Sequence, residues 1–215
     1  MPVAVLVPTM GRPNRVAAVT ENILESCEHA NAYFICEADD QATIDAVADT
    51  LGANLIINRN KRNYAGAINT GLHATDEPYL FAAADDLMFH YGWFEIAMEQ
   101  MTDQIEVVGT NDLGNPEVLA GSHATHYLVA RSYAYQGCMT MPDKMLCEEY
   151  EHNYCDTEFV QTAMSRGKFA PCLSAIVEHR HWAWGKATMD QTYEKGARTV
   201  ATDHARFMAR RYLWT

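Results

Sequence analysis

Two adjacent carboxylates, Asp85 and Asp86, follow the apolar run from Tyr79 to Ala84. A run of this length is typical of a buried strand in an open α/β sheet. In such a sheet, carboxylates at the carboxyl end of a strand lie in the crevice where ligands bind. Aspartate is also common in turns, so the pair by itself is equally consistent with a solvated acidic turn after the strand.

Polar residues also follow three earlier apolar runs. The carboxyl ends of parallel strands meet at one edge of a sheet, so we expect all these residues to line one crevice. Basic side chains there would hold phosphates, and carboxylates would hold Mg²⁺ or Mn²⁺, which favour carboxylate and phosphate oxygens. The pattern predicts a nucleoside diphosphate bound through a divalent cation. The residues are Pro8, Thr9, Gly11 and Arg12, then Glu37 to Asp40, then Arg59, Lys61 and Arg62.

His179 and His181 stand two residues apart, directly after another apolar run. If the strand continues through them, both side chains point to the same face. One imidazole would then complete the metal site opposite Asp85, because neutral imidazole is a good ligand for ions such as Mn²⁺. The alternative is a pair of surface histidines at the end of a strand.

Other candidates for chemistry lie at the start of a predicted helix and among the tryptophans. Asp156 and Glu158 open the helix, where a carboxylate either removes a proton from an acceptor hydroxyl or caps the helix and complements its dipole. Trp93, Trp182 and Trp184 would stack on a sugar ring, although packing in the core is the more common role of tryptophan.

The elements that position these residues alternate strictly between strand and helix through residue 110. Alternation with short connections predicts a mostly parallel, twisted α/β sheet with helices on both faces and right-handed crossovers. Predicted strands cover 3–7, 33–36, 54–57, 79–84 and a segment beginning at 107, and predicted helices cover 14–27, about 44–51, 64–73 and about 93–101. Beyond residue 110 we predict a strand over 126–130, an irregular or mobile segment over 133–155, a helix over 156–166, a strand over 173–178 and an amphipathic helix from about residue 202.

Composition narrows the classes of function. The chain has 215 residues, which predicts a single domain, and a formal net charge of −12, which disfavours binding to duplex nucleic acid. Its six cysteines form no C-x-x-C pair, so buried reduced thiols are expected. The alternative is a disulfide or zinc cluster among Cys138, Cys147, Cys155 and Cys172. No apolar run approaches the length of a membrane span, and no signal peptide is visible. We therefore expect a cytoplasmic protein, and a virus-encoded enzyme in a host cytoplasm would fit the compact form.

Several of these segments resemble the GT-A glycosyltransferases, specifically the family 2-like group. Residues 7–13 resemble the opening V-P-T-x-x-R-P of that family, and residues 63–71 resemble its N-x-G-x-x-x-A-x-N-x-G segment with a shifted glycine. Residues 80–86, with the following Gly-Trp-Phe-Glu, resemble the DXD strand and its P-G-W-L-E sequel. Ala83 replaces the first acid of DXD, and Asp85 matches the last. Residues 155–159 resemble the E-D-x-E-L helix start, with cysteine replacing the first glutamate.

The resemblance implies a GT-A fold with a nucleotide-sugar half (1–110) and an elaborated acceptor half (111–215). It implies a metal site at Asp85 with His179 or His181, and Asp156 as the general base beside Glu158. Sugar or acceptor contacts would come from Trp93, Trp182 and Trp184. The donor would contact Pro8, Thr9, Gly11, Arg12, Glu37, Arg62, Asn69, Ala84, Asp85 and Asp86.

The implied activity is that of a hexosyltransferase dependent on Mn²⁺ or Mg²⁺. It would move a sugar from a UDP- or GDP-linked donor to an acceptor hydroxyl with inversion. Two alternatives remain open. One is a sugar-phosphate nucleotidyltransferase, although its usual glycine-rich and basic first loop is reduced here to one glycine and one arginine. The other is a non-catalytic nucleotide-sugar-binding module, which the loss of an acid at Ala83 would suit.

Overall fold

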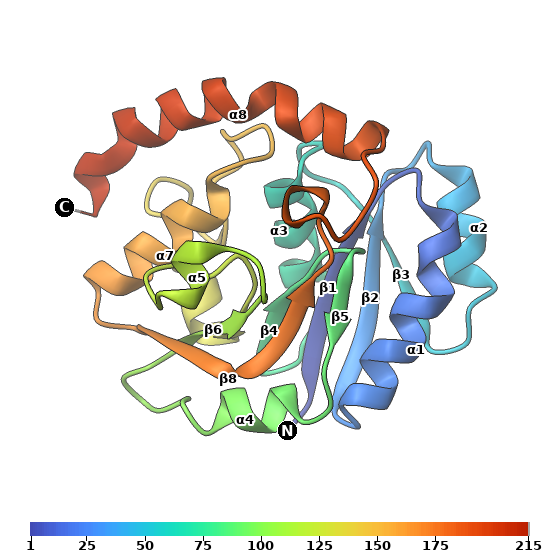
Figure 1. Ribbon diagram of the computed structural model, residues 1–215, viewed down its shortest axis with the longest axis horizontal. Coiled ribbons are helices and arrows are strands. Elements are labelled where there is room, and N and C mark those ends of the chain that lie inside the picture. Colours follow the sequence, from blue (N-terminus) through green and yellow to red (C-terminus); the bar gives the residue numbers. More distant parts are fainter. Residues whose placement is uncertain (215) are drawn as a thin grey trace.

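The computed structural model describes residues 1–214 and contains one eight-stranded sheet with helices on both faces (Figure 1). The strands are β1 (Val3–Thr9), β2 (Ala30–Cys36), β3 (Ala53–Ile57), β4 (Tyr79–Ala82), β5 (Leu87–Phe89), β6 (Val107–Asn111), β7 (Tyr127–Ala130) and β8 (Phe169–His179). The α-helices are α1 (Val16–Ser26), α2 (Gln41–Ala48), α3 (Tyr64–Ala74), α4 (Trp93–Met98), α5 (Pro116–Leu119), α6 (Arg131–Ala134), α7 (Cys155–Ser165) and α8 (Gln191–Arg210). Short 3₁₀ helices are η1 (Pro13–Arg15), η2 (Trp182–Trp184) and η3 (Arg211–Leu213).

The strand order in the sheet is β3-β2-β1-β4-β7-β6-β8-β5. The first four strands are parallel to one another, as the strand–helix alternation predicted. β7 runs antiparallel to both β4 and β6, β6 is parallel to β8, and β5 returns antiparallel along β8. The predicted α/β class is confirmed, and the carboxyl ends of β1, β2 and β4 lie together at one edge.

Each face of the sheet carries its own hydrophobic core. In β1, Val3, Val5 and Val7 pack on the face covered by α1, whereas Ala4 and Leu6 pack on the face covered by α3. Successive side chains of a strand point to opposite faces, so a fully apolar strand is buried on both sides. Burial on both faces holds β1 and β4 in place within the sheet. The polar residues that follow these strands therefore come together at the edge of the sheet.

Two strands depart from the sequence prediction. The three-residue strand β5 was not predicted, because it is shorter than the periodicity that identifies a strand. β8 begins at Phe169, four residues before the predicted start at 173, because Phe169 to Cys172 pair with β6. β8 also continues through His179, so the continuation of the strand to the first histidine is confirmed.

The segment 133–155 is irregular after α6, as predicted, yet much of it is tightly packed. Met145, Leu146 and Tyr150 are fully buried. Asn69 of α3 holds the segment by accepting the backbone N–H groups of Met145 and Leu146 at 3.0 Å each and donating to the Leu146 carbonyl at 2.8 Å. Polar groups of a buried irregular segment need partners, and here one asparagine supplies three of them.

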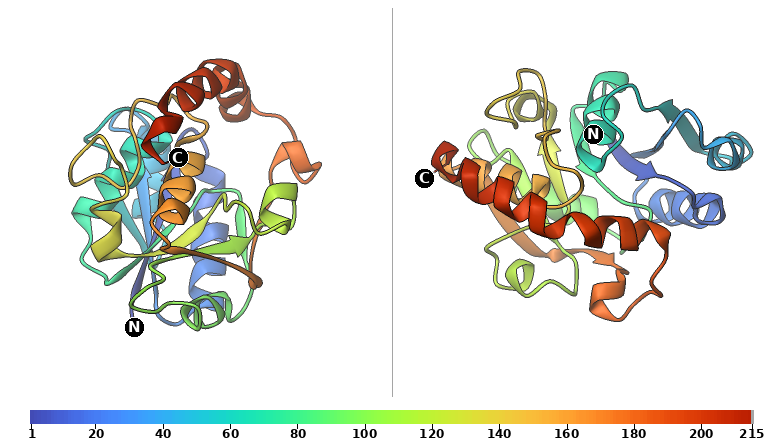
Figure 2. Two further views of the ribbon diagram at one scale, coloured as in Figure 1. Left: turned by 90° about the vertical axis from the view of Figure 1, so that its left-hand side faces the viewer. Right: turned by 90° about the horizontal axis from the view of Figure 1, so that it is seen from above.

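The last helix, α8, crosses the top of the molecule (Figures 1 and 2). It starts at Gln191 rather than near residue 202, because the Asp190 side chain caps it by accepting the Tyr193 N–H at 3.0 Å. Near its middle, fully buried Asp203 accepts the three consecutive backbone N–H groups of 151–153 at 2.9 Å each. At its end, Arg210 pairs with Glu158 at 2.7 Å. Among the described helices, none has the length and apolar character that crossing a bilayer would require.

Candidate active site

A cleft of about 630 Å³ opens where β1, β2 and β4 end, and α8 borders it. It combines residues from both halves of the chain. The N-terminal half contributes Pro8, Thr9, Arg12, Glu37, Arg62, Ala84, Asp85 and Asp86, and the C-terminal half contributes His123, His126, His152, Asp156, His179, His181, Trp184 and Tyr193. The crevice predicted at this sheet edge is therefore present, and it extends to residues of the C-terminal half of the chain.

Asp85 turns toward the first loop of the chain. It accepts hydrogen bonds from Thr9 Oγ1 at 2.8 Å and Arg12 Nη1 at 2.5 Å, and Arg15 Nη1 lies 3.3 Å away. Burial raises the pKa of Asp85, Arg12 opposes that shift, and the neighbouring Asp86 adds to it. Asp85 is thus engaged by arginines rather than by the histidines that were predicted to share a metal with it.

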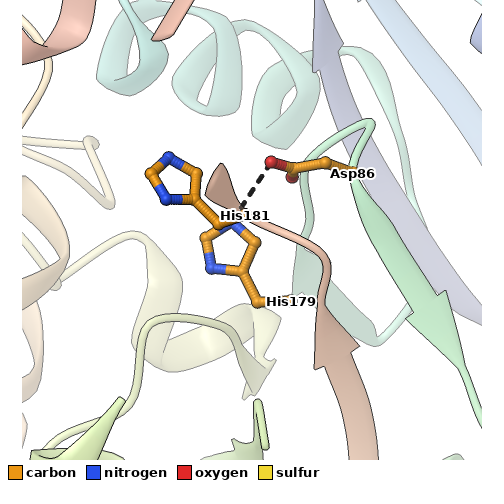
Figure 3. A group of neighbouring side chains, drawn as sticks. All are labelled: Asp86, His179 and His181. Carbon is orange, nitrogen blue, oxygen red and sulfur yellow. Dashed lines mark ion pairs between the residues drawn. The ribbon is translucent and has the colours of Figure 1, made fainter. Parts of the chain in front are cut away.

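Asp86 takes the place beside the histidines (Figure 3). Its Oδ2 lies 3.3 Å from His179 Nε2 and accepts a hydrogen bond from the Tyr193 hydroxyl at 2.8 Å. One ligand atom from each of Asp86, His179 and His181 lies within 4.8 Å of the others. Burial alone would raise the pKa of Asp86, but hydrogen bonds from His179 and Tyr193 outweigh it and hold the pKa well below its usual range.

This group has the donor set of a divalent metal site. One carboxylate and two imidazoles suit Mn²⁺-like ions. Burial and the neighbouring His179 lower the pKa of His181 to about 4, so this ring is neutral and has a lone pair at neutral pH. Two of the buried ligand-type atoms, Asp86 Oδ1 and His179 Nδ1, have no hydrogen-bond partner among the described residues. Unpaired buried polar atoms are costly unless a ligand satisfies them, so the residues present fit a bound cation.

His126 contacts the group formed by Asp86, His179 and His181 through the ring of His179. Its Nδ1 lies 2.9 Å from the Ala82 carbonyl, at the end of β4, and its ring meets that of His179 edge-on with centroids 4.9 Å apart. Burial and His179 lower the pKa of His126 to about 4. The neutral ring must therefore donate through Nδ1 to the carbonyl. The contact joins the end of β4, shortly before Asp86, to β8, which ends at His179.

Asp156 lies at the start of α7 and lines the cleft beside His123. His123 Nε2 is 3.5 Å from Asp156 Oδ2, and His123 is buried. Burial would raise the pKa of Asp156, but the hydrogen bond and charge of His123 lower it overall. For His123, burial favours the neutral form, yet Asp156 outweighs this and raises the pKa. The pair keeps Asp156 ionised and facing the cleft.

The other predicted site residues divide into two sets. Glu37, Arg62 and Trp184 line the cleft, as do Pro8, Thr9, Arg12 and Ala84. The remaining residues, Gly11, Asn69, Trp93, Glu158 and Trp182, do not line it. Asn69 instead hydrogen-bonds the backbone of Met145 and Leu146 in the segment 133–155.

Two of those residues have clear structural roles instead. Trp93 is fully buried, and its ring packs edge-on against Phe81 with centroids 4.6 Å apart, so it cannot stack on a sugar in this conformation. Glu158 is also buried and accepts hydrogen bonds from Arg210 and from the Tyr150 hydroxyl. Its predicted catalytic role is therefore better explained by this structural ion pair.

Residues of the site that were not among the predicted site residues include His123, His126, Asp190 and Tyr193. Asp190 accepts two hydrogen bonds from Arg12 Nη2 and one from Nε, at 2.8–3.0 Å, and Tyr193 stacks under the same guanidinium at 4.4 Å. The Arg12–Asp190 hydrogen bonds join residues 178 apart in sequence. Only the N-cap pattern at Asp190 gave a local signal, since aspartate before a helix is common.

The chain was compared with known proteins. The family described as "Glycosyl transferase family 2" matches residues 4–215. No curated protein sequence matches the chain. Among solved structures, the mannosyltransferase PcManGT from Pyrobaculum calidifontis, in complex with GDP-Man and Mn2+, superposes with a TM-score of 0.71 at 14% identity. The match covers 96% of this chain and 64% of that chain, so the present chain spans less than two thirds of PcManGT.

Glucosyl-3-phosphoglycerate synthase from Mycobacterium tuberculosis, in complex with Mn2+, UDP and phosphoglyceric acid, superposes with a TM-score of 0.65 at 13% identity, covering 96% of this chain and 78% of that one. At these identities the likeness establishes the fold, which is that of GT-A glycosyltransferases. The resemblance seen in the sequence motifs is thereby confirmed. Because the family match extends over residues 4–215, this chain belongs to glycosyl transferase family 2.

Proposed function

We propose that this protein transfers a sugar, with inversion, from a nucleotide diphosphate-sugar to an acceptor hydroxyl in a reaction that depends on Mn²⁺ or Mg²⁺. The observation that carries the proposal is that one cleft holds both a cation-type donor set, Asp86 with His179 and His181, and a separate ionised carboxylate, Asp156. The first set suits the donor diphosphate, and the second suits the acceptor.

On the donor side, Arg12 is the residue best placed to bind phosphate. Its guanidinium is held by Asp85 and lines the cleft. A guanidinium binds phosphate oxygens through paired N–H groups, so a diphosphate would compete for the face that Asp190 now occupies. Thr9 and Glu37, at the ends of β1 and β2, would contact the nucleoside. Complexes of the structural neighbours with GDP-mannose or UDP support a UDP- or GDP-linked hexose as donor.

Asp86, His179 and His181 would hold the cation, and Asp85 would position Arg12 instead of binding metal. When bound, the cation would neutralise negative charge that develops on the departing diphosphate. Tyr193 donates to Asp86 and so keeps this carboxylate ionised and oriented. The two rings are held by β8 and the segment after it, which places both on one side of Asp86.

On the acceptor side, Asp156 would act as general base. The acceptor oxygen attacks the anomeric carbon, the bond from that carbon to the diphosphate oxygen breaks, and the acceptor proton passes to a carboxylate oxygen of Asp156. His123 orients Asp156 and favours its ionised form before the reaction. Trp184 also lines the cleft, and its buried Nε1 has no hydrogen-bond partner within residues 1–214, which suits a sugar hydroxyl at this position.

The proposal is tested with a panel of UDP-, GDP-, CMP- and dTDP-sugars, with and without Mn²⁺. We expect one UDP- or GDP-sugar to raise the Tm only when Mn²⁺ is present, and slow hydrolysis to release the matching nucleoside diphosphate. Release of pyrophosphate from a sugar phosphate and a nucleoside triphosphate would instead identify a nucleotidyltransferase. Binding without any turnover, across the panel and a set of acceptors, would identify a binding module.

A further inference from the structure

A second cluster of reactive side chains lies outside the cleft, beneath the end of α8. The Sγ atoms of Cys138 and Cys147 and a carboxylate oxygen of Glu158 lie within 4.8 Å of one another. All three residues are buried, and all six cysteines of the chain are free thiols. The two cysteines bracket the irregular loop 139–146, whose ends are brought together by the Cys138 N–H donating to the Lys144 carbonyl at 2.9 Å.

The cluster is a poor metal site despite its ligand types. Both Glu158 oxygens already accept hydrogen bonds, from Arg210 Nε and Nη2 and from the Tyr150 hydroxyl. A guanidinium next to the carboxylate repels a cation, and a structural zinc ion needs four ligands. The two sulfur atoms, in contrast, are close enough to bond after rotation about their Cα–Cβ bonds.

We propose that Cys138 and Cys147 form a reversible disulfide that closes the loop 139–146, with a peroxide as oxidant. This inference is independent of the proposed glycosyltransferase function. The loop has little regular structure of its own, and its backbone is held to α3 chiefly through Asn69. A covalent bond across it would tighten the acceptor half, whose next residues, 151–156, line the cleft.

The chemistry of the pair favours this reaction over that of the other thiols. A hydrogen bond from the Cys147 thiol lowers the pKa of Cys138, with help from the backbone N–H of Thr140, and so favours the thiolate form of Cys138. The thiolate is the nucleophilic form. Burial instead raises the pKa of Cys27 to about 11 and that of Cys36 to about 12, which makes these thiols inert.

The steps balance for one molecule of hydrogen peroxide. The Cys138 thiolate attacks one peroxide oxygen, the O–O bond breaks, and the leaving hydroxide takes a proton from solvent, which gives water and a sulfenic acid. The Cys147 sulfur then attacks the Cys138 sulfur, the S–S bond forms, and the S–O bond breaks. The second hydroxide leaves as water with the Cys147 proton. Two electrons pass from the sulfurs to the peroxide.

The test treats the full chain with hydrogen peroxide, alkylates the remaining thiols and maps tryptic peptides by mass spectrometry. Trypsin cuts after Lys144, so the bond would join peptide 132–144 to peptide 145–166. Fragment ions distinguish Cys147 from Cys155, which lies in the same peptide. We expect a dithiothreitol-reversible 138–147 crosslink, and a Tm about 5 °C higher in the oxidised protein.

Two variants control the assignment. Cys147→Ser must lose the crosslink, whereas Cys172→Ser, which removes a buried thiol far from the pair in sequence, must keep it. Recovery of both Cys138 and Cys147 as alkylated thiols in peroxide-treated wild type would overturn the inference. So would a crosslink through Cys155, or zinc retained by the purified protein that protects both thiols from peroxide.

Discussion

At the end of β4, Asp85 and Asp86 are adjacent in sequence but face different partners. Asp85 is held by Arg12 and Thr9, whereas Asp86 faces His179 and Tyr193. The backbone after β4 directs the two side chains apart, so in the proposed function Asp85 would orient the phosphate-binding Arg12 while Asp86 would hold the cation. This division of roles is a property of single residues and is tested by single substitutions.

Asp86→Asn should weaken Mn²⁺ binding to the protein on the order of 100-fold, because a neutral amide replaces the only carboxylate of the group. Asp85→Asn is the matched control. It should leave the Mn²⁺ affinity within a few-fold of wild type, since Asp85 contacts arginines. Calorimetric titration of Mn²⁺ into each variant measures both values. If Asp85→Asn weakened Mn²⁺ binding more than Asp86→Asn did, the metal ligand would be Asp85, as the sequence predicts.

Asp156→Asn should lower kcat for sugar transfer by about 10²–10⁴-fold, because an amide cannot accept the acceptor proton. Donor binding should stay near the wild-type value, since the proposed role of Asp156 is at the acceptor rather than the donor. Asp49→Asn removes an exposed carboxylate outside the cleft and serves as the control. Steady-state kinetics and donor Kd together provide the check, and an Asp156→Asn enzyme with wild-type kcat would exclude this residue as the base.

His123 should contribute stability that depends on pH. Its pKa is raised in the folded state, so its pairing with Asp156 is fully stabilising below the unfolded pKa of about 6.5 and is lost as pH rises through the folded value. His123→Gln should therefore lower the Tm by at least about 3 °C near pH 6 and by clearly less near pH 9. Thermal unfolding of both proteins at each pH measures the difference. An equal deficit at both values would show that the ion pair does not stabilise the fold.

At the scale of elements, α8 is the part that joins the two halves across the cleft. Its cap, Asp190, binds Arg12, its first turn places Tyr193 on Asp86, and Asp203 and Arg210 fix the rest of the helix. The first turn therefore occupies both the arginine and the carboxylate that the donor diphosphate and its cation would use. In the proposed function, donor entry would therefore compete with these contacts.

The substitution Asp190→Asn distinguishes the two roles of Asp190, which caps α8 and pairs its charge with Arg12. Asparagine caps a helix as well as aspartate does, but it no longer offers Arg12 a negative partner. Asp190 is partly exposed, so we expect a modest effect, a nucleoside diphosphate affinity up to about fivefold higher than in wild type. Glu194→Gln, a neutralised carboxylate further along α8, should have no such effect. Affinity that is unchanged or lower in Asp190→Asn would mean that Asp190 does not compete with phosphate.

At the scale of the whole molecule, the sequence predicted the alternating strands and helices of the first 110 residues, except for the short strand β5. Continuous apolar strands such as β1 are buried on both faces, and their regular alternation with helices leaves few other topologies. The edge of the cleft followed from the same pattern, because parallel strands end together. This pattern predicted Arg12 and Glu37 at that edge, whereas Asp156 was predicted from its place at a helix start and from the family resemblance.

What the sequence did not predict depends on side-chain direction and on long-range contacts. Asp85 and Asp86 are adjacent in sequence, and only one of them faces the histidines. The pattern of apolar residues does not show which one, because both lie beyond the end of the strand. His123 and Asp156 are 33 residues apart, and Tyr193 reaches Asp86 across 107 residues. Trp93 stands in a segment that resembles a donor-site motif, yet the core against Phe81 holds it. Such pairings follow from tertiary packing and leave no local pattern.

The central claim is that a divalent cation on Asp86, His179 and His181 mediates binding of a nucleoside diphosphate in this cleft. Calorimetric Kd values for UDP and GDP, in Mn²⁺ and in EDTA, for wild type and Asp86→Asn, test it most directly. We predict that Mn²⁺ tightens binding of one nucleotide at least about tenfold in wild type and that Asp86→Asn abolishes the gain. Equal affinities in Mn²⁺ and EDTA for the wild type, or a full Mn²⁺ gain in Asp86→Asn, would contradict the claim.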